Sequence, residues 1–238
     1  GEVRMPRYGM VIDLLRCIGC YGCQMACKAE HATPPGVTFA RVDIQEAGKY
    51  PNMAKIILPL LCMHCEQPAC EEVCPTKATQ KRADGIVFVD KEKCIGCKYC
   101  MMACPYAARY FYEEERGYFG DQGLTPFEKV GYQKHKRGVA MKCDYCMHRI
   151  DAGVKKGLVP GVDREATPAC VINCMAKARY FGDLDDPESE VAKLVAKGGA
   201  FQLNPELGTD PRTYYLPMVR TIVATAGTGA PLEAKKWK

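Results

Sequence analysis

Short runs of apolar, partly β-branched residues along the chain predict β-strands. These strands cover Tyr8–Asp13, Phe39–Ile44, Lys55–Leu58, Ile86–Val89, Arg109–Tyr112 and Tyr214–Leu216. Turn residues lie next to them: Ala47–Asn52 separates the second strand from the third, and the dipeptide Asp84-Gly85 precedes the fourth. The hydrophobic pattern therefore favours short strands and hairpins.

A helix is predicted near the C-terminal end of the chain. Asp186 can cap its first turn, Pro187 suits its first helical position, and Gly198-Gly199 ends it. Its apolar stripe consists of Val191, Leu194 and Val195. Residues 113–138 follow neither a helical nor a strand period, so we expect an exposed loop or a partner-docking surface there. Residues 226–238 are rich in Gly, Ala and Lys and predict a tail.

No apolar run approaches the roughly 18 residues that a membrane-spanning helix needs, so no direct membrane span is expected. The first ten residues, GEVRMPRYGM, contain neither an apolar signal region nor a twin arginine. If the protein works outside the cytoplasm, we expect that a leader has been removed or that a partner carries the chain across the membrane.

Cysteine changes this picture most. The chain has 238 residues, enough for one large or two small domains with an apolar core, and 16 of them are cysteines. All sixteen fall into four groups of four. Group one is Cys17, Cys20, Cys23 and Cys27; group two is Cys62, Cys65, Cys70 and Cys74; group three is Cys94, Cys97, Cys100 and Cys104; group four is Cys143, Cys146, Cys170 and Cys174.

Group three has the most specific spacing. Its sequence, CIGCKYCMMACP, is the C-x₂-C-x₂-C-x₃-C-P run of bacterial two-cluster iron–sulfur proteins. In such a run three thiolates surround one cubane cluster, and the fourth cysteine, here Cys104, serves a neighbouring cluster. Group one has the same spacing, with Lys28 in place of the proline. Gly19 and Gly96 lie inside the first CxxC of their groups, where glycine lets backbone N–H groups approach cluster sulfurs.

Two other uses of cysteine fit the spacing less well. A disulfide framework is disfavoured because the neighbouring thiols of CxxCxxC cannot all pair well and the chain is not a small secreted scaffold. Structural zinc usually takes two separated CxxC knuckles, which only some groups resemble, so a zinc-structured scaffold is kept as an alternative. His64 lies inside group two, but four cysteines are already present there, so we expect it beside the ligands or facing solvent.

Charge and the remaining motifs exclude other functions. The formal net charge is +5 with thiols counted as neutral, and the basic residues are spread along the chain, so no nucleic-acid partner is expected. Four cubane clusters with their thiolates add about −2 each and would bring the charge to about −3. The sequence has no G-x-G-x-x-G after a strand and no P-loop. The four histidines are scattered, so no catalytic residue is expected: His31, His64, His135 and His148.

The groups repeat in the order A, B, A, B. RCIGCYGCQMAC in group one resembles KCIGCKYCMMAC in group three, and groups two and four share a CxxC…PAC…C pattern, which duplication of a two-cluster unit explains. Each unit needs two groups that exchange their fourth cysteines. Groups two and three are separated only by residues 75–93, which contain a hairpin. Closing this short loop costs the least entropy, so we expect groups two and three to pair and groups one and four to form the other unit. Sequential pairing, one with two and three with four, stays possible on spacing alone.

With four groups in this order, the chain resembles the iron–sulfur subunits of the DMSO reductase, or complex iron–sulfur molybdoenzyme, family. The resemblance covers residues 5 to about 217 and includes MPRYGMVIDLLRCIGC, CPYAARYF and ARYFGDLDDPESEVAKLV. It is closest to the branch of polysulfide, thiosulfate, tetrathionate and respiratory arsenate reductases. It implies an α+β fold of two nested bacterial-ferredoxin-like units with a pseudo-two-fold relation, plus inserted hairpins and loops.

The family's nested pairing also implies which cysteines share a cluster. Set 1 is Cys17, Cys20, Cys23 and Cys174; set 2 is Cys27, Cys143, Cys146 and Cys170; set 3 is Cys62, Cys65, Cys70 and Cys104; set 4 is Cys74, Cys94, Cys97 and Cys100. Nitrate-reductase-like relatives have one cysteine replaced and bind a three-iron cluster. All sixteen positions are cysteine here, so the resemblance implies four [4Fe–4S] clusters.

The same resemblance sets the expected domain limits. The inner unit covers residues 62–104, and the outer unit combines residues 1–27 with 143–182. Residues 28–61 and 105–142 are insertions, and residues 183–238 form a C-terminal helix, strand and tail.

The function implied is electron transfer, with no bond made or broken in this chain. The expected partners are a catalytic subunit with a molybdenum or tungsten bis-pterin cofactor and, often, a membrane quinol-binding subunit. An alternative is the electron-transfer subunit of a soluble formate dehydrogenase or hydrogenase-type complex. The family works at the periplasmic or extracytoplasmic face, with export alongside a partner; a cytoplasmic location stays open. Met175, where a proline is common, and the longer middle of group four depart from the family pattern.

Overall fold

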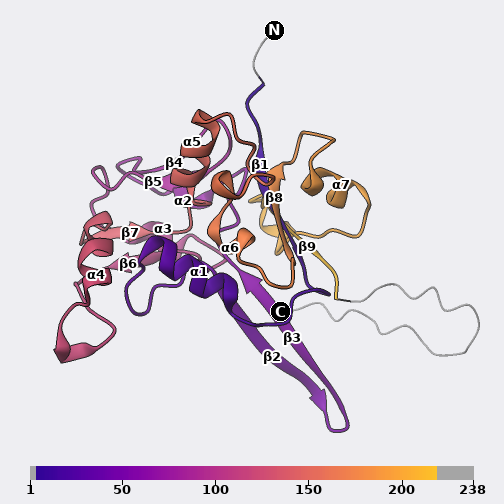
Figure 1. Cartoon of the computed structure of the whole chain (residues 1–238), viewed down its shortest axis with the longest axis horizontal. Coiled ribbons are helices and arrows are strands. Elements are labelled where there is room, and N and C mark those ends of the chain that lie inside the picture. The colour runs from indigo at the N-terminus through magenta and orange to yellow at the C-terminus, as the bar shows by residue number, and fades with distance from the viewer. Residues whose placement is uncertain (1–3, 219–238) are drawn as a thin grey trace, which may run out of the picture.

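The central sheet of the computed structural model, which describes residues 4–218, joins the two ends of that range (Figure 1). Strand β1 (Tyr8–Asp13) runs antiparallel to β8 (Arg179–Asp183) and parallel to β9 (Thr213–Leu216). The side chains of Met10 and Ile12 on β1 are fully buried, as expected for a central strand that reads as a continuous apolar run. The predicted strands at Tyr8–Asp13 and Tyr214–Leu216 are therefore confirmed.

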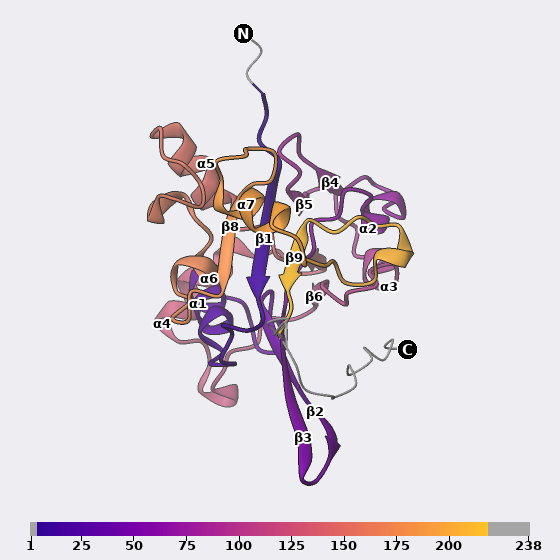
Figure 2. The same cartoon turned by 90° about the vertical axis from the view of Figure 1, so that its right-hand side faces the viewer.

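Three two-stranded hairpins or strand pairs complete the β-structure. Strand β2 (Arg41–Lys49) pairs with β3 (Asn52–Leu60), β4 (Thr79–Lys81) with β5 (Val87–Val89), and β6 (Tyr110–Tyr112) with β7 (Val139–Met141), all antiparallel. The β2–β3 hairpin is longer than the hydrophobic pattern predicts and projects away from the other elements (Figure 2). Its outer half is mostly exposed and mixes polar residues with Ala and Met, so it carries no burial signal.

The helices are short, and most of them carry or adjoin cysteines. They are α1 (Gly22–His31), α2 (Ala69–Glu72), α3 (Tyr99–Met102), α4 (Pro126–Gly131), α5 (Met147–Lys155), α6 (Ala169–Ile172) and α7 (Glu190–Ala196). Short 3₁₀ turns cover Gly120–Gln122, Tyr132–Lys134, Arg164–Ala166 and Pro205–Leu207. Helix α1 packs against α6, and α2 packs against α3, so helices from different groups of cysteines meet.

Two expectations from the sequence are wrong. Residues 113–138 are not a plain loop, because Thr125 and Glu128 form a capping box that starts α4 with Pro126 at its first position. Helix α7 is capped by Ser189, whose side chain accepts a hydrogen bond from the Ala192 N–H, not by Asp186. The predicted tail at residues 226–238 lies outside the described residues.

The core lies beneath the central sheet and between the cysteine-bearing segments. Large, fully buried side chains there come from distant parts of the chain: Met10, Leu61, Met63, Ile86, Tyr145 and Tyr215. Buried cysteines belong to the same cluster of side chains, so the sulfur sites are part of the core. No helix in residues 4–218 combines the length and the apolar character that crossing a bilayer requires.

Candidate metal centre

The CIGC loops of groups one and three share one backbone conformation. Gly19 (φ 67°) and Tyr21 (φ 57°) are left-handed, and so are Gly96 (φ 74°) and Lys98 (φ 64°) at the equivalent positions. The left-handed glycine turns the loop back on itself. The backbone amide of Gly19 lowers the pKa of Cys17, although burial, the larger effect, raises it overall. This effect agrees with the expectation that Gly19 brings its N–H group toward a sulfur.

All sixteen cysteines are free thiols, and two of the expected sets line cavities of their own. One cavity is lined by all four cysteines of set 3: Cys62, Cys65, Cys70 and Cys104. Another is lined by all four of set 1: Cys17, Cys20, Cys23 and Cys174. In both cavities the fourth cysteine comes from a different group than the other three, as an exchange of cysteines between groups requires.

The cysteines of set 2 are all buried and close together. Burial raises the pKa of Cys143 well above its ordinary value, and the neighbouring Cys27 and Cys170 raise it further. Burial also raises the pKa of Cys146, with Cys170 as the next cause. These thiols resist ionisation in an apolar core, so a bound cation must favour their thiolate form if they act as ligands.

Set 4 gathers around Cys100, a buried residue of α3. Burial raises the pKa of Cys100, and the thiols of Cys94, Cys74 and Cys97 add to the effect. Cys74 belongs to group two, so this set also contains one cysteine from a second group.

Backbone amides point at several of the sulfurs. The N–H groups of Ala78 and Thr79 donate to the Cys74 sulfur at 3.2 and 3.4 Å, and the Ala178 N–H donates to the Cys174 sulfur at 3.2 Å. Hydrogen bonds of this kind stabilise thiolate sulfur and tune iron–sulfur clusters.

The donor set fits iron–sulfur clusters. Four cysteines line each of the two cavities together with apolar neighbours, and an N–H donor reaches one ligand of each: Arg109 donates to Cys70 in one and the Ala178 N–H to Cys174 in the other. Burial, and after it the Cys62 thiol, raises the pKa of Cys65 to about 12, so thiolates form there only with a cation present. Soft sulfur ligands in this number and arrangement are those of cubane clusters.

Two buried arginines near the sulfurs were not singled out from the sequence. Arg109 donates to the Cys70 sulfur at 2.8 Å, and Nη1 of Arg179 lies 4.0 Å from the Cys170 sulfur. Burial tends to lower the pKa of Arg109, but the neighbouring thiolates, Cys70 foremost, raise it above its ordinary value. A sequence signal for both arginines exists: each belongs to an ARYF segment that follows the last cysteine of its group, group three or group four.

His64 is buried and does not face solvent. Its ring stacks on that of Tyr145, with ring centroids 3.6 Å apart, and the Val87 N–H donates to its Nδ1 at 3.0 Å. Burial holds the pKa of His64 well below its usual range, so the ring is neutral at pH 7. Within the CxxC of group two it occupies the position that Tyr145 occupies in group four.

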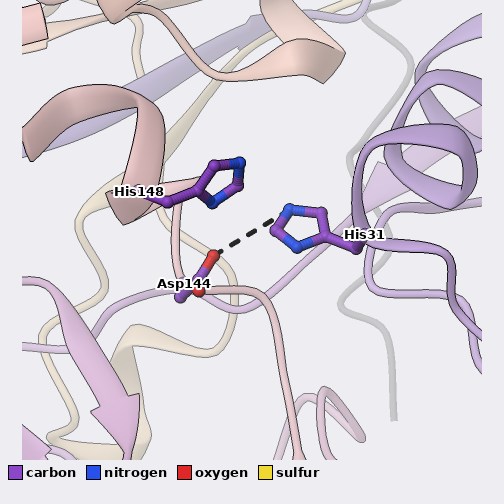
Figure 3. Close-up of side chains that lie close together, drawn as sticks. All are labelled: His31, Asp144 and His148. Atoms are coloured by element: carbon purple, nitrogen blue, oxygen red, sulfur yellow. Dashed lines mark ion pairs between the residues drawn. The ribbon is translucent and has the colours of Figure 1, made fainter. Parts of the chain in front are cut away.

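Two histidines that are distant in the sequence meet beside set 2. Figure 3 shows His31 of α1 and His148 of α5 close to Asp144. Nε2 of His31 lies 3.2 Å from the Cys146 sulfur and 4.0 Å from an Asp144 oxygen, while Nε2 of His148 lies 2.7 Å from a Glu30 oxygen. Although they are scattered in the sequence, these two histidines are neighbours in the fold. Because His31 faces a sulfur of set 2, it is a hydrogen-bond partner for that ligand.

Comparisons with known proteins agree with this chemistry. Residues 53–120 match the family model of the 4Fe-4S dicluster domain. The chain is 42% identical over 223 residues to a selenate reductase subunit of Mesobacillus selenatarsenatis, which covers 87% of this chain and 70% of that protein. It is 39% identical over 234 residues to a sulfite dehydrogenase subunit of Allochromatium vinosum, which covers 91% of this chain and 85% of that protein. It is 38% identical over 215 residues to a tetrathionate reductase subunit of Salmonella typhimurium, which covers 88% of this chain and 72% of that protein.

The extent of these matches shows the family, because they reach over most of both chains. The ferredoxin-like dicluster match and the mixed helix and strand content agree with the expected α+β class. The chain belongs to the iron–sulfur, electron-transfer subunits of the DMSO reductase family of molybdoenzymes, on the branch that contains the selenate, tetrathionate and arsenate reductase subunits.

Proposed function

We propose that the chain carries four [4Fe–4S] clusters, one in each of the four sets of cysteines. When bound, each cluster takes up and releases one electron at a time. The observation that carries the proposal is that two cavities are each lined by three cysteines of one group and the fourth cysteine of another. The pKa shifts of Cys100 and Cys143, to which cysteines of sets 4 and 2 contribute, support the other two sets. Sequential pairing would require Cys104 to lie with group four, yet Cys104 lines the cavity of Cys62, Cys65 and Cys70.

The proposed fold is two nested ferredoxin-like units related by a pseudo-two-fold axis. Residues 62–104 form the inner unit, and residues up to 27 form the outer unit with residues 143–182. The packing of α1 on α6 and of α2 on α3 supports this pairing of groups. The stacking of His64 on Tyr145 supports the axis, since the two rings occupy equivalent positions of the repeat and meet each other.

The proposed order of the clusters is that of sets 1, 2, 3 and 4. The Cys23 thiol of set 1 contributes to raising the pKa of Cys170 of set 2, and the Cys62 thiol of set 3 contributes to raising that of Cys143 of set 2. Arg109, which donates to Cys70 of set 3, has its own pKa raised in part by Cys100 of set 4. These electrostatic couplings support a row in which sets 2 and 3 are in the middle.

The two ends of this row are open to a partner. Cys20 of set 1 and Cys97 of set 4 are the exposed cysteines among the sixteen. Beside them Ile18 and Ile95, at equivalent positions, are 63% and 67% exposed. Apolar side chains next to an exposed ligand suit close docking of redox partners, because docking would exclude water and shorten the path for the electron.

The partners that we propose are a catalytic subunit with a molybdenum or tungsten bis-pterin cofactor at one end and a quinone-linked membrane subunit or another redox partner at the other. This chain then relays electrons and contributes no catalytic residue of its own. A soluble formate dehydrogenase or hydrogenase-type complex is the alternative assembly. The proposed location is the extracytoplasmic face of the membrane, as a complex exported together. Isolation of the native complex, with metal analysis of the co-purified chain, tests these partners: molybdenum or tungsten is expected there.

Metal analysis of the chain itself tests the proposed cofactors. Protein purified without oxygen should contain about sixteen irons and about sixteen sulfides per chain and be brown. A folded, colourless protein that contains zinc and no iron would instead establish the zinc-structured scaffold. Eight irons or fewer in fully folded protein would refute the count of four clusters.

A further inference from the structure

Two buried arginines occupy equivalent positions in the repeat. Arg109 is the fifth residue after Cys104, and Arg179 is the fifth residue after Cys174, each inside an ARYF segment. Their exposed fractions are 5% and 4%. Neither takes part in any ion pair with a carboxylate that occurs within residues 4–218. Both are therefore buried cations without a carboxylate partner in the described part of the chain.

Arg109 reaches the ligands of two sets at once. Its Nη2 donates to the Cys70 sulfur of set 3 at 2.8 Å, and its Nη1 donates to Oγ1 of Thr79 at 3.1 Å. The Thr79 N–H in turn donates to the Cys74 sulfur of set 4 at 3.4 Å. The guanidinium thus lies against set 3 and is linked through one residue to set 4.

Arg179 has the corresponding place in the outer unit. It lines the cavity of set 1, and its Nη1 lies 4.0 Å from the Cys170 sulfur of set 2. Cys170 and Cys70 are themselves equivalent, since each follows a Pro-Ala pair in its group. Nη2 of Arg179 is buried and has no hydrogen-bond acceptor within residues 4–218. Arg179 thus keeps one buried donor without an acceptor in the described part of the chain.

A buried guanidinium without a counter-charge is strongly unfavourable, so negative charge must lie nearby. The thiolates and the clusters they hold would supply it. Reduction adds one negative charge to a cluster, and a fixed positive charge beside it stabilises that reduced form. The effect is large in a core that excludes water, because the charges are poorly screened.

We propose that Arg109 and Arg179 set the cluster potentials: each raises the reduction potentials of the two clusters of its own unit. Arg109 acts on the clusters of sets 3 and 4, most strongly on set 3, and Arg179 acts on those of sets 1 and 2. The inference rests on the proposed ligand sets and goes beyond them by giving a role to two residues that bind no iron.

The test is an EPR-monitored redox titration of the full, iron-loaded chain in its complex, with wild type, Arg109→Gln and Arg109→Lys. Signals are assigned through Cys104→Ser, which lacks the set 3 ligand, and Cys174→Ser, which lacks the set 1 ligand. In Arg109→Gln we expect the midpoint potential of the set 3 cluster to fall by at least about 59 mV. At the wild-type midpoint potential, the ratio of oxidised to reduced cluster then rises at least about tenfold, since one electron is transferred. Sets 1 and 2 should keep their potentials, and Arg109→Lys should stay close to wild type.

Arg7→Gln is the matched control, because it removes one positive charge from an exposed ion pair with Asp185 and should move no potential. If Arg109→Gln loses the set 3 cluster while Arg109→Lys keeps it, the potential of the set 4 cluster is the readout in Arg109→Gln, and the proposal requires that potential to fall. Unchanged potentials in Arg109→Gln, a shift as large in Arg109→Lys, or cluster loss in both variants would overturn it. Fewer than four cubane signals in the wild type would instead count against the proposed clusters themselves.

Discussion

Individual cysteines in this chain differ in how deeply they are buried, even where the spacing of their groups is the same. Cys170 and Cys143 lie in the core, whereas Cys20 and Cys97 are exposed. In groups three and four the fourth cysteine lines a cavity of another group: Cys104 joins the cavity of group two, and Cys174 joins that of group one. At the residue scale, the exchange of fourth cysteines is therefore the feature on which the assignment of ligands depends.

Cys104→Ser tests that exchange. Serine oxygen is a poor ligand for iron–sulfur clusters, so the variant should lose the cluster of set 3 and keep that of set 4, although Cys104 belongs to the same sequence group as Cys97 and Cys100. EPR of the reduced variant and its iron content are the measurements, and about four irons should be missing. Cys174→Ser is the matched variant in the other unit and should remove the set 1 cluster. Loss of the set 4 signal in Cys104→Ser, with the set 3 signal intact, would reverse the assignment.

Elements outside the cysteine groups also position the sites. Segment 113–138 folds back onto the end of α1, where the Tyr118 hydroxyl donates to the Thr33 carbonyl at 2.9 Å and His135 Nε2 lies 2.9 Å from the His31 carbonyl. Helix α4 inside this segment begins at the capping box of Thr125 and Glu128. The segment is thus a packed support for α1, which carries Cys23 and Cys27.

Thr125→Ala should destabilise α4 locally by about 1 kcal/mol, because it removes the N-cap acceptor of a short helix. Amide hydrogen exchange should become faster in residues 126–131, while the iron content stays at the wild-type value. Gln122→Ala, an exposed change in the same segment, is the control and should leave exchange in α4 as it was. Wild-type exchange rates in the Thr125→Ala helix would show that the box contributes nothing to α4.

The sequence predicted the elements that carry a strong local signal and missed those that do not. Strand β1 was predicted with its observed limits, because six consecutive residues are nearly all buried. The outer half of the β2–β3 hairpin is exposed, and so the strand pattern faded before the strands ended. Helix α4 does have a sequence signal, the TPFE of residues 125–128, but it is too short to show a period. The neighbourhood of His31, His148 and Asp144 depends on tertiary packing and has no sequence signal.

The whole molecule is arranged so that the proposed row of sites starts and ends at the surface. The four cysteines of set 2 are buried and those of set 3 are buried or partly buried, whereas the loops with Cys20 and Cys97 reach solvent beside Ile18 and Ile95. The bound clusters would also change the overall charge from the formal +5 to about −3, so partners would meet an acidic holoprotein. Both features suit a relay that docks at two places.

Ile18→Glu and Ile95→Glu test whether these loops are the docking sites. Each places a charge at one proposed end without removing a ligand, so each should weaken binding of one redox partner at least about tenfold and leave the other interaction intact. Binding of each purified partner to each variant, together with the iron content, is the measurement. Met53→Glu, on the exposed β2–β3 hairpin, is the control for an added surface charge. If both partners bind both variants as they bind the wild type, the ends of the row lie elsewhere.

The central claim is that one chain holds four separate cubane clusters in a row. Spin-quantified EPR of the fully reduced, anaerobically purified protein tests it most directly. The account predicts about four unpaired spins per chain, one from each reduced cluster, with line broadening from magnetic coupling between neighbours. Two spins or fewer per folded, iron-saturated chain, or a three-iron signal in the oxidised protein, would contradict it.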